Sequence, residues 1–208
     1  MKSRAVILVN VGTPESPAVK DVRKYLSQFL NDPGVIDIPP FFRKMLVELI
    51  IVPFRAPRSA KLYSRLWTEK GSPLLVHLQN LLLRIQGSGD PTNVNGASVP
   101  HSEPVTVSFY VAMRYGNPSL KGILEHARDI GHDHITVFPL YPQYSSATTG
   151  SVIDLVNKVT GGWGATPKID TVRQFYNSCS FIKPMAAKIR AAGSESCDRI
   201  VFSYHGLP

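Results

Sequence analysis

The sequence predicts an α/β fold with an open, mainly parallel sheet flanked by helices, on three observations. Residues 5–11 form a nearly unbroken apolar and β-branched run, typical of a strand buried on both faces. Residues 16–31 then carry apolar side chains three and four positions apart, as an amphipathic helix does. After residue 105, strand and helix patterns alternate, which implies right-handed crossovers and parallel pairing.

The elements follow in order along the chain. The first strand ends in a turn at Gly12, Thr13 and Pro14, and the first helix, stopped by an Asp-Pro-Gly turn, is expected to pack on the sheet. Further helices are predicted over residues 58–67, 73–86, 120–130, 152–159 and 181–192, and further strands over residues 105–113, 135–140, 168–172 and 199–204. Residues 87–98 lack periodicity and are rich in turn formers, which predicts a surface loop.

A segment between prolines, residues 39–57, mixes apolar and basic side chains at helical spacing. Its apolar members include Phe41, Phe42, Met45, Leu46, Leu49 and Ile50, and its basic members are Arg43, Lys44 and Arg55. One interpretation is an ordinary helix packed in the core. The other is an apolar flap over a pocket, or a contact with a membrane surface. The pattern does not choose between them.

Composition and charge exclude several classes of protein. A chain of 208 residues with 43% hydrophobic and 18% charged residues is typical of a globular protein. The longest apolar stretch, residues 45–54, is interrupted by Glu48 and Pro53 and is too short to span a membrane. A formal charge of +8 could attract nucleic acid, an anionic bilayer or an acidic substrate. Because the basic residues are scattered, we expect no nucleic-acid binding.

The two cysteines bear on the cellular compartment. Cys179 and Cys197 share no CxxC spacing with each other or with a histidine, so neither a disulfide framework nor a zinc site is indicated. No export signal is apparent at the N-terminus. We therefore expect a cytoplasmic protein, and peripheral contact with the inner face of the membrane stays open.

Ligands of open parallel sheets bind beyond the carboxyl ends of the strands, so the residues there are the candidate site. They are Asn10, Gly12, Thr13 and Pro14 after the first strand, Met113, Arg114, Tyr115, Gly116 and Asn117 after the second, Tyr141, Pro142, Gln143, Tyr144, Ser145 and Ser146 after the third, and Ser203, Tyr204, His205 and Gly206 after the last. Tyrosines with an arginine fork favour a large, flat aromatic ligand that carries acidic groups. Neither glycine-rich phosphate motif, G-x-G-x-x-G or G-x-x-x-x-G-K-[ST], is present at this edge.

His205, in the segment SYHGLP, is the leading candidate for chemistry. A strand-end imidazole can accept a proton near neutral pH or ligate a transition metal. His132 and His134 are a rival metal pair, but they lack a third ligand and precede a strand, which places them on the opposite edge. A serine hydrolase using Ser203 is disfavoured because the G-x-S-x-G elbow is missing.

Several segments together resemble bacterial ferrochelatases. They are LVNVGTP with VRKYLSQFLNDPGVID, then KLYSRLWTEKGSPL, AMRYGNPSL, FPLYPQYSSATTGS and VFSYHGLP, in this order. The resemblance spans nearly the whole chain and is weakest at residues 87–98 and 161–165. It implies chelatase-like, Rossmann-like α/β lobes with a porphyrin cleft between them. Residues 1–165 would form the N-terminal porphyrin-binding lobe, and residues 166–208 the start of an incomplete second lobe.

The resemblance implies an activity and a site. Family members are lyases of haem and porphyrin biosynthesis that insert Fe²⁺, as a substrate, into protoporphyrin IX to give protohaem, without an organic cofactor. His205 matches the family's invariant histidine, which implies that it binds the iron or accepts a pyrrole proton. The implied walls of the cleft are Asn10, Gly12, Thr13, Arg114, Tyr115, Pro142, Gln143 and Tyr144.

The chain also departs from the family. Family members continue beyond Pro208 with a glutamate partner for the histidine, the rest of the second lobe and any iron–sulfur cysteines. We therefore expect a truncated chain with little or no activity alone. A non-catalytic tetrapyrrole- or haem-binding fragment and a related cobalt or nickel chelatase remain as alternatives. YPQYSSATTGS looks more like the protoporphyrin-using type than the coproporphyrin-using one, a choice that stays open.

Overall fold

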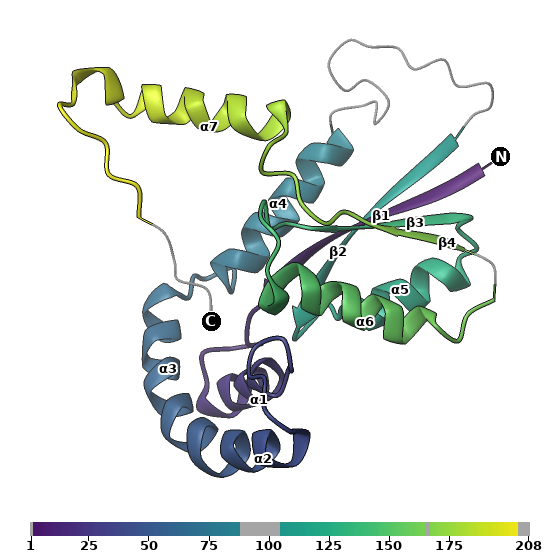
Figure 1. Cartoon of the computed structure of the whole chain (residues 1–208), viewed down its shortest axis with the longest axis vertical. Coiled ribbons are helices and arrows are strands. Elements are labelled where there is room, and N and C mark those ends of the chain that lie inside the picture. The colour runs from purple at the N-terminus through teal and green to yellow at the C-terminus, as the bar shows by residue number, and fades with distance from the viewer. Residues whose placement is uncertain (1, 88–104, 165–166, 204–208) are drawn as a thin grey trace.

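The computed structural model describes residues 2–87, 105–164 and 167–203, which form an α/β fold on an open parallel sheet (Figure 1). The four strands are β1 (Lys2–Gly12), β2 (Val105–Tyr115), β3 (His134–Pro139) and β4 (Lys168–Thr171). Their order in the sheet is β2-β1-β3-β4, and all three pairings are parallel. The predicted fold class is confirmed.

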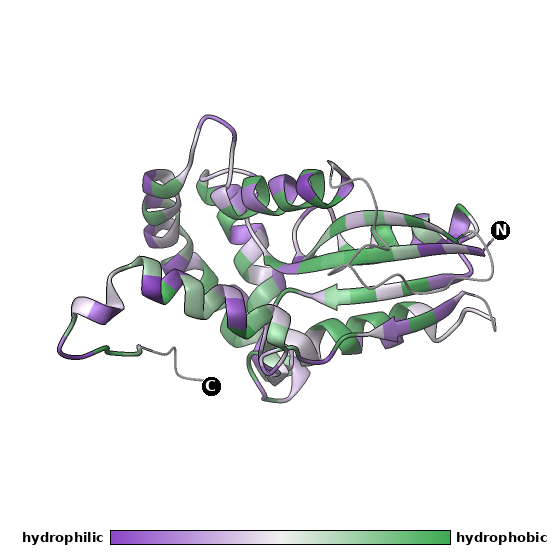
Figure 2. Cartoon of the chain, turned by 90° about the horizontal axis from the view of Figure 1, so that it is seen from above, coloured by the Kyte–Doolittle hydropathy of each residue, from purple (hydrophilic) through white to green (hydrophobic). Residues whose placement is uncertain are grey.

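Helical segments connect and flank the strands. They are α1 (Val19–Leu30), α2 (Pro40–Met45), η1 (Leu46–Ile51), α3 (Val52–Leu66), α4 (Pro73–Gly87), α5 (Leu120–Asp129), η2 (Ser146–Gly150), α6 (Ser151–Thr160), α7 (Cys179–Ala191) and η3 (Ser194–Ser196). The middle of the sheet carries mostly hydrophobic colour in Figure 2, whereas the helices show both colours. This difference reflects a sheet covered on both faces by amphipathic helices.

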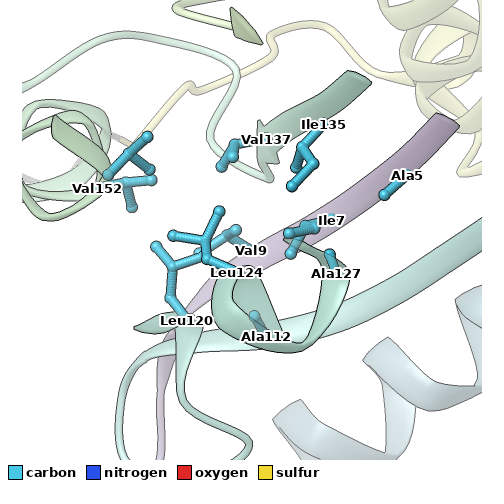
Figure 3. Packing of buried hydrophobic residues seen from close by; sticks show 11 residues of the cluster. Ala5, Ile7, Val9, Ala112, Leu120, Leu124, Ala127, Ile135, Val137 and Val152 are labelled. Carbon is cyan, nitrogen blue, oxygen red and sulfur yellow. The ribbon is translucent and has the colours of Figure 1, made fainter. Parts of the chain in front are cut away.

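The central strand β1 is buried on both faces, as its sequence predicts. Ile7 and Val9 are fully buried and pack with Leu124 of α5 and Val152 of α6 (Figure 3). On the other face, Leu8 packs in a cluster with Leu78 of α4 and Met113 of β2. Burying each large aliphatic side chain contributes roughly 1.5–3 kcal/mol, so this strand anchors the lobe.

Helix α1 buries the stripe that its periodicity predicts, but against another helix and not the sheet. Val22, Leu26 and Leu30 pack in one cluster with Ala56 and Ala60 of α3. Small alanine side chains let the two helices approach closely. The helix meets the sheet at the strand ends, where Val11 of β1 packs against this cluster and the rings of Phe29 and Tyr115 meet edge to face at 5.3 Å. The prediction that α1 packs on the sheet is therefore wrong in the main.

Residues 40–66 form one continuous helical run, α2, η1 and α3, where the sequence predicted two helices. Pro53 lies in the first turn of α3, and the wider π-helical turns of η1 precede it. This arrangement accommodates a residue without a backbone N–H. Val47 and Val52 are buried, yet Phe41 and Phe54 are each 73% exposed. This helical run therefore packs in the core through one face and exposes apolar side chains on the other.

The strand predicted over residues 199–204 is absent from its described part, residues 199–203. Ile200 and Val201 are exposed there, and α7 buries no residue and extends away from the sheet (Figure 1). An apolar run becomes a strand only where a neighbouring strand offers hydrogen bonds, and none of the described strands pairs with this one. β4 pairs with β3 and so belongs to the same four-stranded sheet. The predicted boundary between two lobes at residue 165 stays a prediction. The predicted loop of residues 87–98 lies outside the described residues except Gly87.

Candidate functional site

The ends of β1 and β2 touch backbone to backbone, which requires two glycines. Gly12 has φ +112°, and a Cβ there would lie 1.8 Å from the carbonyl oxygen of Tyr115. Gly116 has φ +83°, and a Cβ there would lie 2.7 Å from the carbonyl oxygen of Thr13. Positive φ angles of this kind are costly for residues with a side chain. The two turns that follow these strands are therefore held tightly together.

Arg114 is the centre of a buried polar network. Its Nε donates to the Ser151 hydroxyl at 2.7 Å and to the Ser151 carbonyl at 3.1 Å, and its Nη2 forms an ion pair with Asp32. The Asp32 carboxylate also accepts from the Tyr115 hydroxyl at 2.9 Å, from Ser151 at 2.7 Å and from the Gly34 amide at 2.7 Å. The guanidinium is thus fixed in one orientation, with 18% of the side chain exposed.

Tyr115 belongs to this network and to the core. Its ring is 2% exposed and packs with the α1–α3 cluster, so the ring does not offer a face to a ligand. Burial raises the pKa of the Tyr115 hydroxyl, although Ser151 and Arg114 act in the opposite direction. The hydroxyl therefore stays protonated at neutral pH and donates to Asp32. The sequence predicted that both Arg114 and Tyr115 line the site, but of these two side chains only Arg114 remains partly exposed to solvent.

A cavity of about 400 Å³ opens beside this network, between α1 and the turn that joins β2 to α5. It is lined by Lys24, Gln28, Arg114, Tyr115, Gly116, Asn117, Ser119, Leu120, Lys121 and Leu155. A much smaller cavity of about 10 Å³ lies next to it and is lined in part by Thr13. Thr13 is 5% exposed, and its hydroxyl has no hydrogen-bond partner among the described residues.

The residues after β3 reach solvent at the same edge of the sheet. The Pro142 carbonyl accepts hydrogen bonds from the backbone amides of Phe175 and Tyr176, at 2.9 and 3.0 Å. Tyr144 is 42% exposed, and the Arg173 guanidinium lies 5.1 Å from its ring centroid. Gln143 is exposed as well. This part of the predicted site offers an aromatic face and a cation.

The remaining predicted residues differ in their placement. Asn10 turns its side-chain oxygen to the amide of Val11 at 2.7 Å. His205 lies outside the described residues, as do Tyr204 and Gly206. Since β1 lies between β2 and β3, the residues after these three strands share one edge. The structure thus brings Gly12, Thr13, Arg114 and Tyr115 together and leaves Gln143 and Tyr144 beside them at the solvent.

Aromatic side chains form a layer under this edge. The rings of Tyr25 and Tyr63 meet edge to face at 6.3 Å, and Tyr63 meets Trp67 in the same way at 6.3 Å. Burial raises the pKa of Tyr25, Tyr63 and Tyr141. All three therefore stay neutral near pH 7 and can only donate or accept hydrogen bonds.

His132 and His134, the rival metal pair, lie at the opposite edge of the sheet and contact different side chains. His132 is 4% exposed, with Nδ1 2.6 Å from the Ser3 hydroxyl and Nε2 3.0 Å from the Tyr110 hydroxyl. Burial lowers its pKa. His134 instead contacts Asp170 at 2.7 Å. Among the residues that the structure describes, no three ligating side chains gather to hold a metal ion.

Sequence reasoning missed Asp32 and Ser151, the two partners of Arg114. Asp32 signalled only the end of a helix, and Ser151 stood in an ordinary run of small residues. They lie 82 and 37 positions from Arg114 along the chain, and no local pattern reports such contacts. Lys24 and Gln28 were missed because they are polar positions of an amphipathic helix, where solvated residues are the usual occupants.

Fold and site together define an α/β protein whose candidate ligand-binding residues gather at the carboxyl ends of a parallel sheet. The family model described as Ferrochelatase matches residues 3–208, and the chain belongs to the ferrochelatase family. It is 40% identical over 98% of its length to a ferrochelatase of Methylococcus capsulatus. Ferrochelatases of Legionella pneumophila (strain Paris) and Shewanella denitrificans are 38% and 36% identical. The chain spans 58%, 57% and 59% of these relatives' lengths.

Proposed function

We propose that the protein inserts Fe²⁺ into protoporphyrin IX to give protohaem in haem biosynthesis. The observation that carries the proposal is the family match over residues 3–208. The arrangement at the carboxyl edge of the sheet supports it, because an exposed tyrosine ring with a cation beside it suits a flat aromatic acid. Iron enters the reaction as a substrate, and the proposal involves no organic cofactor.

The ring is proposed to lie over the end of β3 with one carboxylate near Arg173. The Tyr144 ring is available for stacking, and Arg173 lies 5.1 Å from that ring. Arg114 has no part in this contact, because it lines a different cavity, beside α1. Tyr115 is buried and donates to Asp32, the partner of Arg114. Asn10 and Gln143 complete the proposed contacts from neighbouring strands.

The proposed chemistry is an exchange of two pyrrole protons for the metal. As Fe²⁺ binds the four ring nitrogens, both N–H bonds break and two protons leave, one to a nearby base and the other to water, so the net charge of the ring core is unchanged. A neutral imidazole can accept one of these protons near pH 7. The proposal gives this part to His205, the histidine that the resemblance of the SYHGLP segment implies.

Ring binding is tested by titrating the chain with protoporphyrin IX and following Soret absorbance and tryptophan quenching. Tyr144→Ala should weaken binding of both the free acid and its dimethyl ester. Arg173→Ala should weaken binding of the free acid alone, because only the free acid offers a carboxylate. The matched control is Arg128→Ala, whose guanidinium lies 4.8 Å from the Trp163 ring at another place. Equal effects of the two arginine variants would contradict the proposed orientation.

Insertion is tested anaerobically with Fe²⁺ and the bound ring. Because the chain spans 58% of the length of a curated relative, insertion is assayed in a protein extended to the length of those relatives, with the present chain, expected to form little or no haem, beside it. In the extended protein the proposal expects haem formation that is lost in His205→Ala and kept in His77→Ala, an exposed histidine on α4. Coproporphyrin, Co²⁺ and Ni²⁺ serve as competing substrates in parallel reactions. Ring binding without insertion of any metal would favour a non-catalytic tetrapyrrole-binding protein.

We also propose a cytoplasmic protein that contacts an anionic membrane surface through an apolar lip. The lip consists of the exposed side chains of Phe41, Phe42, Met45, Leu49, Ile50 and Phe54. A groove of about 300 Å³ in it is lined by Lys44, a cation that suits lipid headgroups, and by Glu48, whose carboxylate accepts from Ser27 and Asn31. Both cysteines are free and exposed, which fits a reducing compartment. Among the described residues, no helix is long and apolar enough to cross a membrane.

Membrane contact is tested by sedimentation with phosphatidylcholine vesicles that contain phosphatidylglycerol. Replacing Phe41 and Phe42 by serine should reduce the bound fraction, since these rings are exposed and apolar. The control replaces Leu62 and Leu66 of α3, which are 60% and 63% exposed, by serine. Equal losses in both pairs would show that exposed apolar residues bind without regard to position, and the lip would not be supported.

A further inference from the structure

The cavity of about 400 Å³ between α1 and the β2–α5 turn is basic. Lys24, Arg114 and Lys121 line it, and among the described residues no aspartate or glutamate does. Its remaining polar lining comes from neutral groups such as Gln28 and Asn117. Each of these cations also has a carboxylate partner outside the lining, so the attraction for an anion comes from the charged N–H donors that the three side chains can present to the cavity.

The three cations differ in how firmly they are held. Arg114 is fixed by Asp32 and Ser151, so its position is set before a ligand arrives. Lys24 pairs with Glu15 at 3.2 Å and Lys121 with Glu125 at 3.8 Å, and all four side chains are well exposed. Exposed pairs of this kind are weak and easily exchanged. Both lysines can therefore turn toward a ligand, while Arg114 provides a rigid anchor.

The amino end of α5 adds to the positive field of the cavity. Ser119 caps the helix by accepting from the amide of Gly122 at 3.2 Å, and Leu120 and Lys121 form its first turn. All three line the cavity. The partial positive charge at the start of a helix favours an anion there.

A second, independent feature is the buried hydroxyl of Thr13. It has no hydrogen-bond partner among the described residues, and Thr13 lines the small neighbouring cavity. That cavity shares Lys24, Gln28 and Gly116 with the large one, and its volume of about 10 Å³ approaches the size of one water. A buried hydroxyl without a partner is costly, so the site offers an unused polar group at its inner end.

We propose that the large cavity binds a small polyanion that carries at least two phosphate or carboxylate groups, with a water in the small cavity linking the ligand to the Thr13 hydroxyl. One anionic group would meet the fixed Arg114, and the second would meet Lys24 and Lys121. Glu15 on the wall of the small cavity accepts from the Asn117 amide at 2.7 Å and keeps this partner when Lys24 turns to the ligand, and Asp21 accepts from the Ser16 hydroxyl at 2.5 Å. The site is separate from Tyr144, where the porphyrin is proposed, and it does not depend on that proposal.

The test is isothermal titration calorimetry of the whole chain with pyrophosphate and with citrate, at constant ionic strength. We expect saturable binding of one ligand per chain, weakened about tenfold or more by the pair Lys24→Ala and Lys121→Ala. Thr13→Val should weaken binding without loss of the folded state in circular dichroism. Preference for pyrophosphate or for citrate would assign the site to phosphates or to carboxylates.

The control pair, Lys61→Ala and Lys188→Ala, removes the same charge from exposed positions on α3 and α7. Equal weakening by both pairs would mean attraction by net charge alone and would overturn the proposal, as would no binding of either anion. Repeating the titration with protoporphyrin IX present separates the two sites. Unchanged affinity supports a distinct site, and competition would assign the cavity to porphyrin carboxylates.

Discussion

Arg114 and Asp32 form a buried ion pair that ties the carboxyl end of β2 to the turn after α1. The pair is closed by Ser151 at the start of α6, so three separate elements meet at one carboxylate. A buried ion pair adds little stability by itself, because both charges lose their hydration. Its larger effect is geometric, since it fixes the guanidinium at the edge of the basic cavity.

Asp32→Asn should destabilise the chain by about 3 kcal/mol, because it leaves the largely buried Arg114 charge without its partner. Urea unfolding followed by circular dichroism measures the change. Asp129→Asn is the control, since its pair with Arg128 is exposed and should contribute less than about 1 kcal/mol. A loss no larger than that of the control would show that the ion pair does not hold these elements together.

Gly12→Ala should cost at least about 2 kcal/mol, because the new Cβ meets the Tyr115 carbonyl at a φ that side chains rarely adopt. The melting temperature measures the effect. Gly162→Ala serves as the comparison, since nothing lies within 4 Å of a Cβ built there. Similar melting temperatures for the two variants would refute the close approach of the β1 and β2 ends.

Stability should fall as pH drops below about 6.5, the ordinary pKa of histidine, because burial lowers the pKa of His132 in the folded chain. The unfolded chain then binds the proton more readily, so acid favours unfolding. Asp133 opposes this shift and His126 adds to it. Urea midpoints measured on either side of this pH should differ less in His132→Gln than in the unchanged chain. His77→Gln, at an exposed position, should keep the full dependence.

Stability should also fall as pH rises above about 10, the ordinary pKa of tyrosine, because burial raises the pKa of Tyr25, Tyr115 and Tyr141. The unfolded chain ionises first and is favoured by alkali. Phenolate absorbance should therefore include a late rise that coincides with loss of the circular dichroism signal. Appearance of all phenolates while the fold persists would be incompatible with this burial.

The secondary structure was predictable where the signal is local. The strand around Ile7 and the helix around Leu26 follow from a few neighbouring side chains, and both are present in the structure. The strand predicted over residues 199–204 failed over its described part because pairing depends on a neighbour elsewhere in the chain. The packing of α1 was wrong for the same reason, since its buried stripe does not say which surface covers it.

The candidate site was predictable only in part. Topology placed Thr13, Arg114 and Tyr144 at the same edge of the sheet, since parallel strands present their carboxyl ends together. It could not show that Tyr115 turns into the core. Nor could it show that Arg114 is balanced by Asp32. These outcomes depend on side chains brought together from distant positions.

The sequence alone determined the order of the first four strands and the helices between them, the parallel pairing that follows from it, and the family, because each depends on patterns within short segments. Only the tertiary structure decided which surface α1 covers, which residues hold Arg114 and where the basic cavity opens. Hydrophobic periodicity says that a face is buried, but the partner is selected by packing and by satisfied hydrogen bonds between residues far apart in the chain.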